Sequence, residues 1–185
     1  MAAAEQRFAH YGYGKTTMAD IAQDCDCSAA NLYRYFESKQ EIAAEVSRRC
    51  MQERVQAMRQ VVRCPGVSAV GRLRTYVLES LKFSRDTLDN RPKINELIAY
   101  IMEQRVDLVR ERIRVQQGLL AEILAFGNET GEFDVEDVLA TAQSVHASVM
   151  LFEVPLFQSL FGENEFFDIA NTVVDLLVSG LARRE

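Results

Sequence analysis

The chain has 185 residues, of which 48% are hydrophobic and 26% are charged, as in globular proteins that bury a core of their own. It carries neither a long apolar run behind a basic N-terminus nor the roughly 18 consecutive apolar residues of a membrane span, so we expect a cytoplasmic protein with no membrane partner. The net charge is −6, but residues 1–49 hold six basic and seven acidic residues, which leaves 15 basic and 20 acidic residues beyond them.

The N-terminal segment predicts three helices in quick succession. The first covers residues 2–11, with Phe8 and Tyr11 on its buried face, before two glycines end it. Thr17 can cap the second, and Asp20 is placed to return the hydrogen bond as in a capping box. Ser28 can cap a third, very short helix. Starts this close together are hard to reconcile with an ordinary bundle, in which helices average about 11 residues.

A longer helix is predicted over residues 39–62. Ser38 and Glu41 repeat the capping-box pattern before it, and apolar residues recur along it at helical spacing. Residues 64–66, Cys-Pro-Gly, end it. The next helix is expected over residues 68–88.

The middle of the chain is less sharply divided. Pro92 suits the first turn of a helix, where its missing N–H costs nothing. Residues 93–126 carry no strong helix breaker except Gly118, so the sequence leaves open whether they form one helix or two. Residues 127–131, Gly-Asn-Glu-Thr-Gly, are predicted to be a loop.

Two strongly apolar helices are expected to close the chain, over residues 135–161 and 165–182. Pro155 removes a backbone hydrogen bond, so it should kink the first of them or end it early. Alternating Val, Ile and Thr runs bounded by turn residues are nearly absent, whereas apolar residues recur at three and four positions almost everywhere. The sequence therefore predicts an all-α fold.

The cysteines and histidines do not form a recognisable metal site. Two cysteines are separated by a single residue, but structural zinc sites need four convergent ligands and the histidines are distant in sequence. We therefore expect reduced thiols, no metal and no cofactor. The residues concerned are Cys25, Cys27, Cys50, Cys64, His10 and His146.

Residues 16–22, Thr-Thr-Met-Ala-Asp-Ile-Ala, and residues 28–39, Ser-Ala-Ala-Asn-Leu-Tyr-Arg-Tyr-Phe-Glu-Ser-Lys, resemble the DNA-binding head of TetR-type regulators. Members of that family show the same Thr-Thr, Asp-Ile-Ala, Ser, Leu-Tyr, Tyr-Phe and Ser-Lys elements at this spacing. The resemblance covers residues 1 to about 48. It implies a helix-turn-helix DNA-binding domain over 1–48 and a helical effector-binding and dimerisation domain over 49–185.

The turn departs from the family pattern. The family carries a sequence like Ala-Gly-Val there, whereas this chain has Cys-Asp-Cys, with Asp26 where glycine is common. Aspartate tolerates the left-handed conformation better than most residues, so we expect the turn to survive. The sequence begins almost at its first helix, so it leaves open whether a basic N-terminal arm contacts the minor groove.

The short helix has residue types that suit base recognition. Small alanines at its start let its N-terminal end approach base edges in a major groove about 12 Å wide, where Asn suits adenine and Arg suits guanine. Tyrosine, lysine and helix-capping hydroxyl groups suit phosphates. The alternative is that both tyrosines cover the core and the lysine is merely solvated. The predicted DNA-binding residues are Thr17, Ser28, Ala29, Ala30, Asn31, Tyr33, Arg34, Tyr35 and Lys39.

Heads of this kind bind DNA as dimers, so a second copy of the chain is an expected partner. The last two predicted helices carry more apolar surface than one small domain can cover, which favours a four-helix interface built from two subunits. An ordinary core within one chain remains the alternative. The predicted dimer residues are Val145, Val149, Phe152, Phe157, Phe166, Val173 and Leu177.

The family resemblance also implies an effector cavity among the middle helices. The candidates are a mostly apolar set with a few polar atoms, as small-molecule pockets use, although each such residue taken alone is more often plain core or surface than a ligand contact. A lone histidine on an apolar helix is usually a hydrogen-bonded structural residue. The predicted effector-binding residues are Tyr76, Phe83, Tyr100, Met102, His146 and Met150.

We therefore predict a transcriptional regulator: a repressor that a small, largely apolar ligand releases from a palindromic double-stranded operator. An enzyme is not expected, since there is no glycine-rich phosphate loop or histidine-rich metal set, and the carboxylates are scattered over helix faces. A small all-α enzyme and a helical interaction protein without a DNA role are the alternatives. The ligand, the operator, the regulated genes and the direction of regulation stay open.

Overall fold

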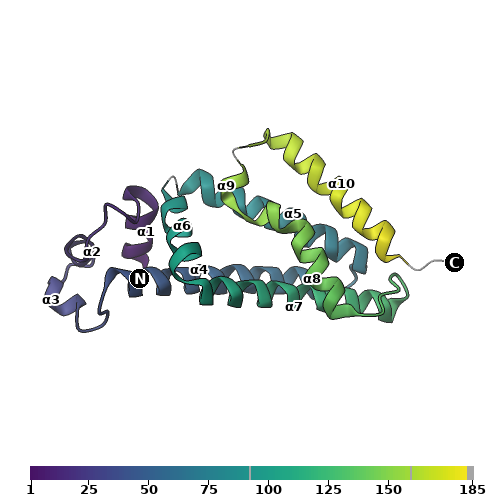
Figure 1. Cartoon of the computed structure of the whole chain (residues 1–185), viewed down its shortest axis with the longest axis horizontal. Coiled ribbons are helices and arrows are strands. Elements are labelled where there is room, and N and C mark those ends of the chain that lie inside the picture. The colour runs from purple at the N-terminus through teal and green to yellow at the C-terminus, as the bar shows by residue number, and fades with distance from the viewer. Residues whose placement is uncertain (92, 159, 183–185) are drawn as a thin grey trace. The chain divides into compact units, whose positions relative to one another are not determined.

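The computed structural model describes residues 1–91, 93–158 and 160–182, which form a succession of helices (Figure 1). Within these residues there is no strand, only an isolated bridge between Phe133 and Ala182. The all-α prediction is confirmed. None of the described helices is long and apolar enough to cross a membrane. The helices are α1 (Ala2–Tyr11), α2 (Met18–Asp24), α3 (Ala29–Leu32), α4 (Lys39–Val62), α5 (Ala69–Asn90), α6 (Ile94–Gln104), α7 (Val106–Thr130), α8 (Val138–Val149), a 3-10 turn η1 (Met150–Glu153), α9 (Pro155–Gln158) and α10 (Glu163–Leu181).

The chain divides into two compact units, each with its own apolar core. The first unit combines Met1–Glu53 with Thr87–Arg112, and the second combines Arg54–Asp86 with Ile113–Glu185. The expected division at residue 48 was drawn from a motif and stays a prediction. The core of the first unit includes Phe8, Ile21, Leu32, Ile42 and Leu97. The core of the second includes Leu73, Tyr76, Leu120, Phe152 and Phe166.

The capping signals of the first unit are used as the sequence predicts. Thr17 and Asp20 form a complete capping box at the start of α2. The Ser28 hydroxyl accepts a hydrogen bond from the Asn31 N–H at 3.1 Å. In the turn between α2 and α3, Asp26 adopts a left-handed φ of 51°, so aspartate takes the conformation that glycine usually supplies.

Several local expectations were wrong. Tyr11 is 53% exposed rather than buried, and the Arg7 guanidinium lies 5.0 Å from its ring centroid. The predicted loop over residues 127–131 is mostly helix, because α7 continues to Thr130 and only Gly131 lies beyond it. Gly127 serves a different purpose: a Cβ there would come within 2.0 Å of the Phe133 ring, so glycine permits the close approach.

The open question over residues 93–126 is settled as two helices. Arg105 leaves the helical conformation (φ −131°, ψ 55°) between α6 and α7, and its guanidinium pairs with Asp107 at 2.6 Å. Pro92, expected in a first turn, lies outside the described residues. The prediction that Pro155 would end a helix early is confirmed, because α8 ends at Val149 and η1 separates it from α9.

Candidate functional site

The side chains around α3 are presented to solvent. Leu32 is buried and anchors the element in the first core, whereas Ala30, Asn31 and Arg34 are exposed. Helical hydrogen bonding continues past the end of α3, since the Phe36 N–H donates to the Leu32 carbonyl at 3.1 Å. Residues 28–36 thus form a short helical segment, which we call the α3 rod. One side of it is apolar and packs into the first core, and the other side is polar and exposed to solvent.

Both tyrosines of this segment are exposed. Tyr33 is 54% exposed and Tyr35 is 72% exposed, so neither covers the core. Ser28 is exposed and Ala29 is half-buried, with the Ser28 hydroxyl turned to the backbone of the helix that it caps. The alternative reading of the tyrosines as core cover does not fit this exposure.

The predicted phosphate contact Lys39 is already engaged within the first unit. Its ammonium donates to the Tyr13 carbonyl at 2.8 Å and lies 4.3 Å from the Tyr13 ring centroid. The Tyr13 ring stacks on Tyr100 at 4.3 Å, and burial together with the Tyr100 hydrogen bond raises the pKa of Tyr13. Tyr13 therefore holds the Lys39 ammonium in place, and Tyr100 has a packing role in the first core.

Arg7 balances the acidic residues of α2. Its Nη2 donates to Asp24 at 2.8 Å and its Nε donates to the other oxygen of the same carboxylate, while Nη1 lies 3.5 Å from Asp20. The hydrogen bond from Arg7 holds the pKa of Asp24 below its usual value. Sequence reasoning missed this role of Arg7, because the spacing of 17 residues gave no local signal. The pairing offsets the negative charge of α2.

Thr17→Val should destabilise the first unit by about 1 kcal/mol, because it removes the hydroxyl that caps α2. That hydroxyl accepts from the Asp20 N–H at 3.2 Å and donates to the Asp20 carboxylate at 2.7 Å. The same hydroxyl is the main reason that the pKa of Asp20 is lowered, so Asp20 favours the fold above its ordinary pKa and loses that effect as the pH falls through the lowered value. Thermal unfolding and an NMR titration of Asp20 check both effects.

Thr17→Ser is the matched control, since it keeps the hydroxyl and should keep both the melting temperature and the Asp20 titration. An unchanged Asp20 titration in the valine variant would mean that the capping box does not control this carboxyl.

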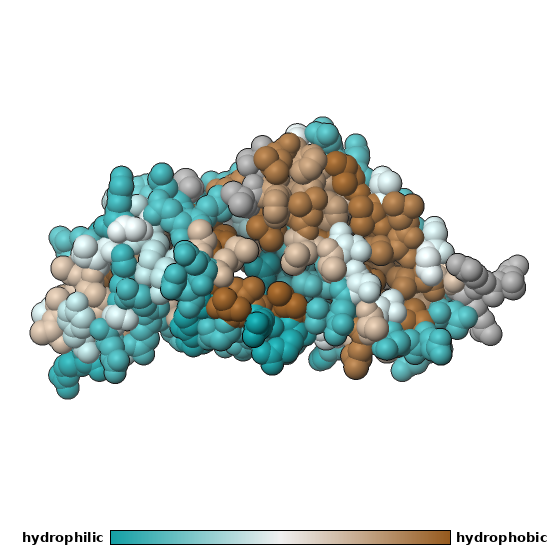
Figure 2. Space-filling view, viewed as in Figure 1, coloured by the Kyte–Doolittle hydropathy of each residue, from teal (hydrophilic) through white to brown (hydrophobic). Residues whose placement is uncertain are grey.

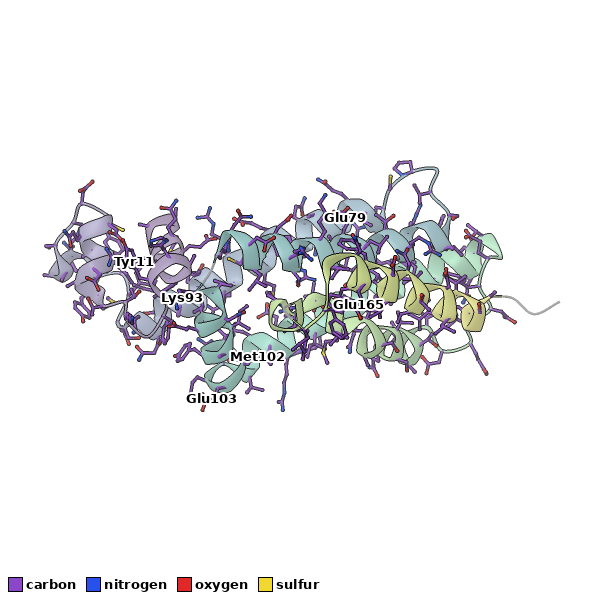
Figure 3. All side chains as sticks on the ribbon, turned by 90° about the horizontal axis from the view of Figure 1, so that it is seen from above. Tyr11, Glu79, Lys93, Met102, Glu103 and Glu165 are labelled. Carbon is purple, nitrogen blue, oxygen red and sulfur yellow. The ribbon has the colours of Figure 1, made fainter. Side chains whose placement is uncertain are left out.

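The six predicted effector residues are not brought together as one set. Tyr76, His146, Phe83 and Met150 belong to the second unit, whereas Tyr100 and Met102 belong to the first. Met102 is 56% exposed, and Figure 3 places it on α6 beside Glu103. Phe83 lies at the surface with the Arg54 guanidinium 5.2 Å from its ring centroid, and Met150 is 45% exposed.

Two of the six meet at a buried carboxylate that sequence reasoning missed. Glu153 is only 1% exposed, and the Tyr76 hydroxyl donates to its Oε1 at 3.4 Å. The His146 Nε2 lies 3.5 Å from its Oε2. The amide of Gln116 donates to the same Oε2. Polar side chains from α5, α7 and α8 thus converge on one acid.

Arg54 completes this group, which we call the Glu153 cluster: Arg54, Tyr76, Gln116, His146 and Glu153. The Arg54 Nη1 donates to the Glu153 carbonyl at 3.3 Å, and Nη2 lies 4.0 Å from the Glu153 carboxylate. A signal for it exists in the sequence, because Glu153 is the single charged residue between positions 138 and 162. A lone carboxylate in so apolar a stretch is either at the surface or specially paired.

The predicted dimer residues are divided between core and surface. Val145, Val149, Phe152 and Phe166 are buried in the second unit's own core, and Phe157, Val173 and Leu177 are half-buried. Other apolar side chains of the same region are more accessible, and Figure 2 shows apolar residues gathered over α10. The most exposed of them are Leu139, Leu160 and Leu176.

Across the described part of the chain, no group of three or more His, Cys, Asp or Glu side chains is placed to hold a metal ion. The four cysteines are free thiols.

Two family models match the chain. The model described as bacterial regulatory proteins, tetR family, matches residues 1–46, and that of the tetracyclin repressor-like C-terminal domain matches residues 69–174. No curated protein matches the sequence.

Solved structures share the fold over nearly the whole chain. A transcriptional regulator from Cytophaga hutchinsonii superposes with a TM-score of 0.76 at 24% identity, covering 98% of this chain and 96% of that one. FadR from Bacillus subtilis, solved with stearoyl-CoA, gives a TM-score of 0.68 at 19% identity, covering 97% of this chain and 96% of FadR. SmeT, the repressor of a multidrug efflux pump of Stenotrophomonas maltophilia, gives a TM-score of 0.71 at 16% identity, covering 98% of this chain and 88% of SmeT.

Proposed function

Because the chain belongs to the TetR family of bacterial regulatory proteins, and is thus a DNA-binding transcriptional regulator and not an enzyme, we propose that it is a repressor released from its operator by a small, largely apolar ligand. Its partners are operator DNA, a second copy of the chain and a small-molecule effector. A bacterial regulator that binds DNA acts in the cytoplasm, where we place this one. A helical interaction module without a DNA role is not favoured.

The observation that carries the DNA-binding proposal is the exposed polar side of the α3 rod. Ala29 and Ala30 are small enough to let the N-terminal end of α3 enter a major groove. Asn31 and Arg34 are exposed beside them and are suited to adenine and guanine edges. We assign base readout to these residues, within a DNA-binding domain over residues 1–48.

We assign the contacts with DNA phosphates to residues in and around the α3 rod. Tyr33 and Tyr35 are exposed, and a tyrosine hydroxyl can donate to a phosphate oxygen. Thr17 and Ser28 lie at the starts of α2 and α3, where backbone N–H groups favour an anion. Lys39 is held by Tyr13 and adds a positive charge at a fixed place.

A palindromic operator requires two heads spaced by about one turn of DNA, roughly 34–36 Å. We propose that the dimer forms through α8 and α10. Leu139 on α8 and Leu176 on α10 are each 69% exposed, and burying such side chains against a second copy is favourable. The half-buried Val173 and Leu177 would lie at the edge of the same contact.

The ligand proposal places the effector in the helical domain over residues 49–185. Two proteins of the same fold were solved with small molecules, FadR with stearoyl-CoA and SmeT with triclosan, which supports an effector for this chain as well. If the ligand favours a dimer whose heads do not fit consecutive grooves, DNA must weaken ligand binding by the same factor.

Selection from a random duplex library tests the DNA-binding role directly. We expect the purified chain to enrich a palindrome whose half-sites lie one helical turn apart, and a gel shift on that sequence to weaken as salt rises. Enrichment of no sequence would overturn the assignment of Asn31 and Arg34 to base edges.

A further inference from the structure

The Glu153 cluster is costly if it serves only to hold the second unit together. Moving a carboxylate and a guanidinium out of water costs several kcal/mol each, and well-packed apolar residues are often as stable as a buried ion pair. Glu153 is 1% exposed and Arg54 is 9% exposed, so both are largely desolvated. Stability alone gives little reason to place these charges among leucine and phenylalanine side chains.

Four side chains from four helices converge on this one carboxylate. Arg54, Tyr76, Gln116 and His146 come from α4, α5, α7 and α8. The Tyr76 hydroxyl is 3.4 Å from the carboxylate and the Arg54 Nη2 is 4.0 Å away. The His146 Nε2 is buried at 3.5 Å from the acid and makes no hydrogen bond. The side chains are arranged around an anion, but the Glu153 carboxylate leaves the His146 Nε2 without a hydrogen bond.

The acid and its donors lie on different kinds of element. Each donor lies on an α-helix of at least 12 residues, whereas Glu153 ends the four-residue 3-10 turn η1. The next residue, Val154, is extended, with φ −106° and ψ 115°, before Pro155. A 3-10 turn is a common connector between helices, and its hydrogen-bond geometry is poorer than that of an α-helix. The acceptor therefore lies on the part of the cluster that can move with least loss of structure.

Tyr76 of the cluster belongs to the buried apolar core of the second unit. Leu73, Leu120, Ile123 and Phe166 are all buried in the same core. A ligand that reaches these donors must therefore carry an apolar body, as small-molecule sites generally require. Among ionic head groups the four donors favour an anion, since a cation would have to lie beside Arg54.

We propose that Glu153 occupies the place of a ligand carboxylate, and that an apolar monocarboxylic acid binds by displacing the Glu153 side chain from Arg54, Tyr76, Gln116 and His146. The inference rests on the proposed effector-binding role and adds the chemical class of the effector. Displacement of Glu153 moves η1 and so changes the link between α8 and α9. The turn η1 thus carries the acid that the ligand head group displaces, and it is also the element that moves when this acid is displaced.

Isothermal titration calorimetry on the full chain at pH 7, without DNA, tests the proposal with decanoate as the probe. Glu153→Gln keeps the size of the side chain but removes the competing charge. We expect this variant to bind decanoate at least tenfold more tightly than the wild-type chain. The methyl ester of decanoic acid should bind more weakly than decanoate to both.

Two further variants serve as controls. Glu136→Gln removes an exposed carboxylate of the same unit outside the cluster, and it should leave decanoate binding unchanged. The double variant Arg54→Met, Glu153→Gln removes both charges, so it avoids an unpaired buried charge. It should fold, as judged by its circular dichroism, and should lose at least tenfold in decanoate affinity relative to Glu153→Gln.

Decyltrimethylammonium decides the sign of the ligand charge. If it binds the wild-type chain and is lost in Glu153→Gln, the site takes cations and the proposal is wrong. Equal decanoate affinity of Glu153→Gln and Glu136→Gln, or no decanoate binding by either, would also overturn it. Sequence-selective DNA binding is measured separately by gel shift, so its failure would count against the regulator role and not against the carboxylate site.

Discussion

Arg54→Met with Glu153 left in place is expected to lower the free energy of unfolding by about 3–5 kcal/mol, the usual cost of leaving a buried charge without its partner. Glu153 is 1% exposed, so water cannot replace the guanidinium. The variant also removes the hydrogen bond from Nη1 to the Glu153 carbonyl, which ties α4 to η1. Urea unfolding followed by circular dichroism measures the loss.

Two comparisons separate this effect from the loss of any arginine. Arg59→Met changes an exposed arginine on the same helix and should shift the free energy of unfolding by no more than about 0.5 kcal/mol. The double variant with Glu153→Gln should recover most of the stability, because no unpaired carboxylate remains. If the single and double variants were equally unstable, the packing of the Arg54 side chain and not its charge would explain the loss.

Arg34→Ala is expected to weaken binding to the selected palindrome and to relax the preference at one base pair of each half-site. A bidentate contact to guanine is worth about 1–3 kcal/mol, so each half-site loses roughly 5-fold to 150-fold in affinity. A dimer carries the change twice, so the fold-losses of the two half-sites multiply. Gel shifts on the palindrome and on single-base variants measure both effects.

Asn31→Ala should relax the preference at a different base pair, where adenine is favoured. Tyr35→Phe should weaken binding to all sequences alike, because a phosphate contact carries no sequence information. Arg59→Ala is the matched control, since Arg59 is an exposed arginine outside residues 1–48. If Arg34→Ala lowered affinity equally for every duplex, Arg34 would be a phosphate ligand and base readout would lie elsewhere.

The head could be predicted closely from the sequence because its signals are local. Thr17, Ser28 and Ser38 each meet a backbone N–H three residues later, so a capping site can be seen without knowing the tertiary structure. The bounds of α1 and α4 follow from glycine and proline in the same way. Asp26 was predicted from the residue type alone, and its positive φ confirms the expectation.

The second unit could be predicted less well, because its determinants are distant in sequence. Gln116 and Glu153 are 37 residues apart, and Arg54 and Glu153 are 99 apart. No periodic pattern indicates such pairs. Helix stripes showed that residues such as Val145 and Phe166 are apolar, but not whether they pack inside one chain or against another. The extent of α7 was missed because Gly127 looked like a breaker, whereas it makes room for Phe133.

The charge pairs of the first unit bear on how the head responds to ionic strength. Arg7, Arg48 and Arg49 each pair with a carboxylate of that unit. Cations that are already neutralised displace few counter-ions from the double helix, so the logarithm of affinity should fall only gently with the logarithm of salt concentration. The affinity of this regulator for its operator would then depend mainly on shape complementarity and hydrogen bonding. A rise in the potassium concentration of the cell would therefore lower that affinity only slightly.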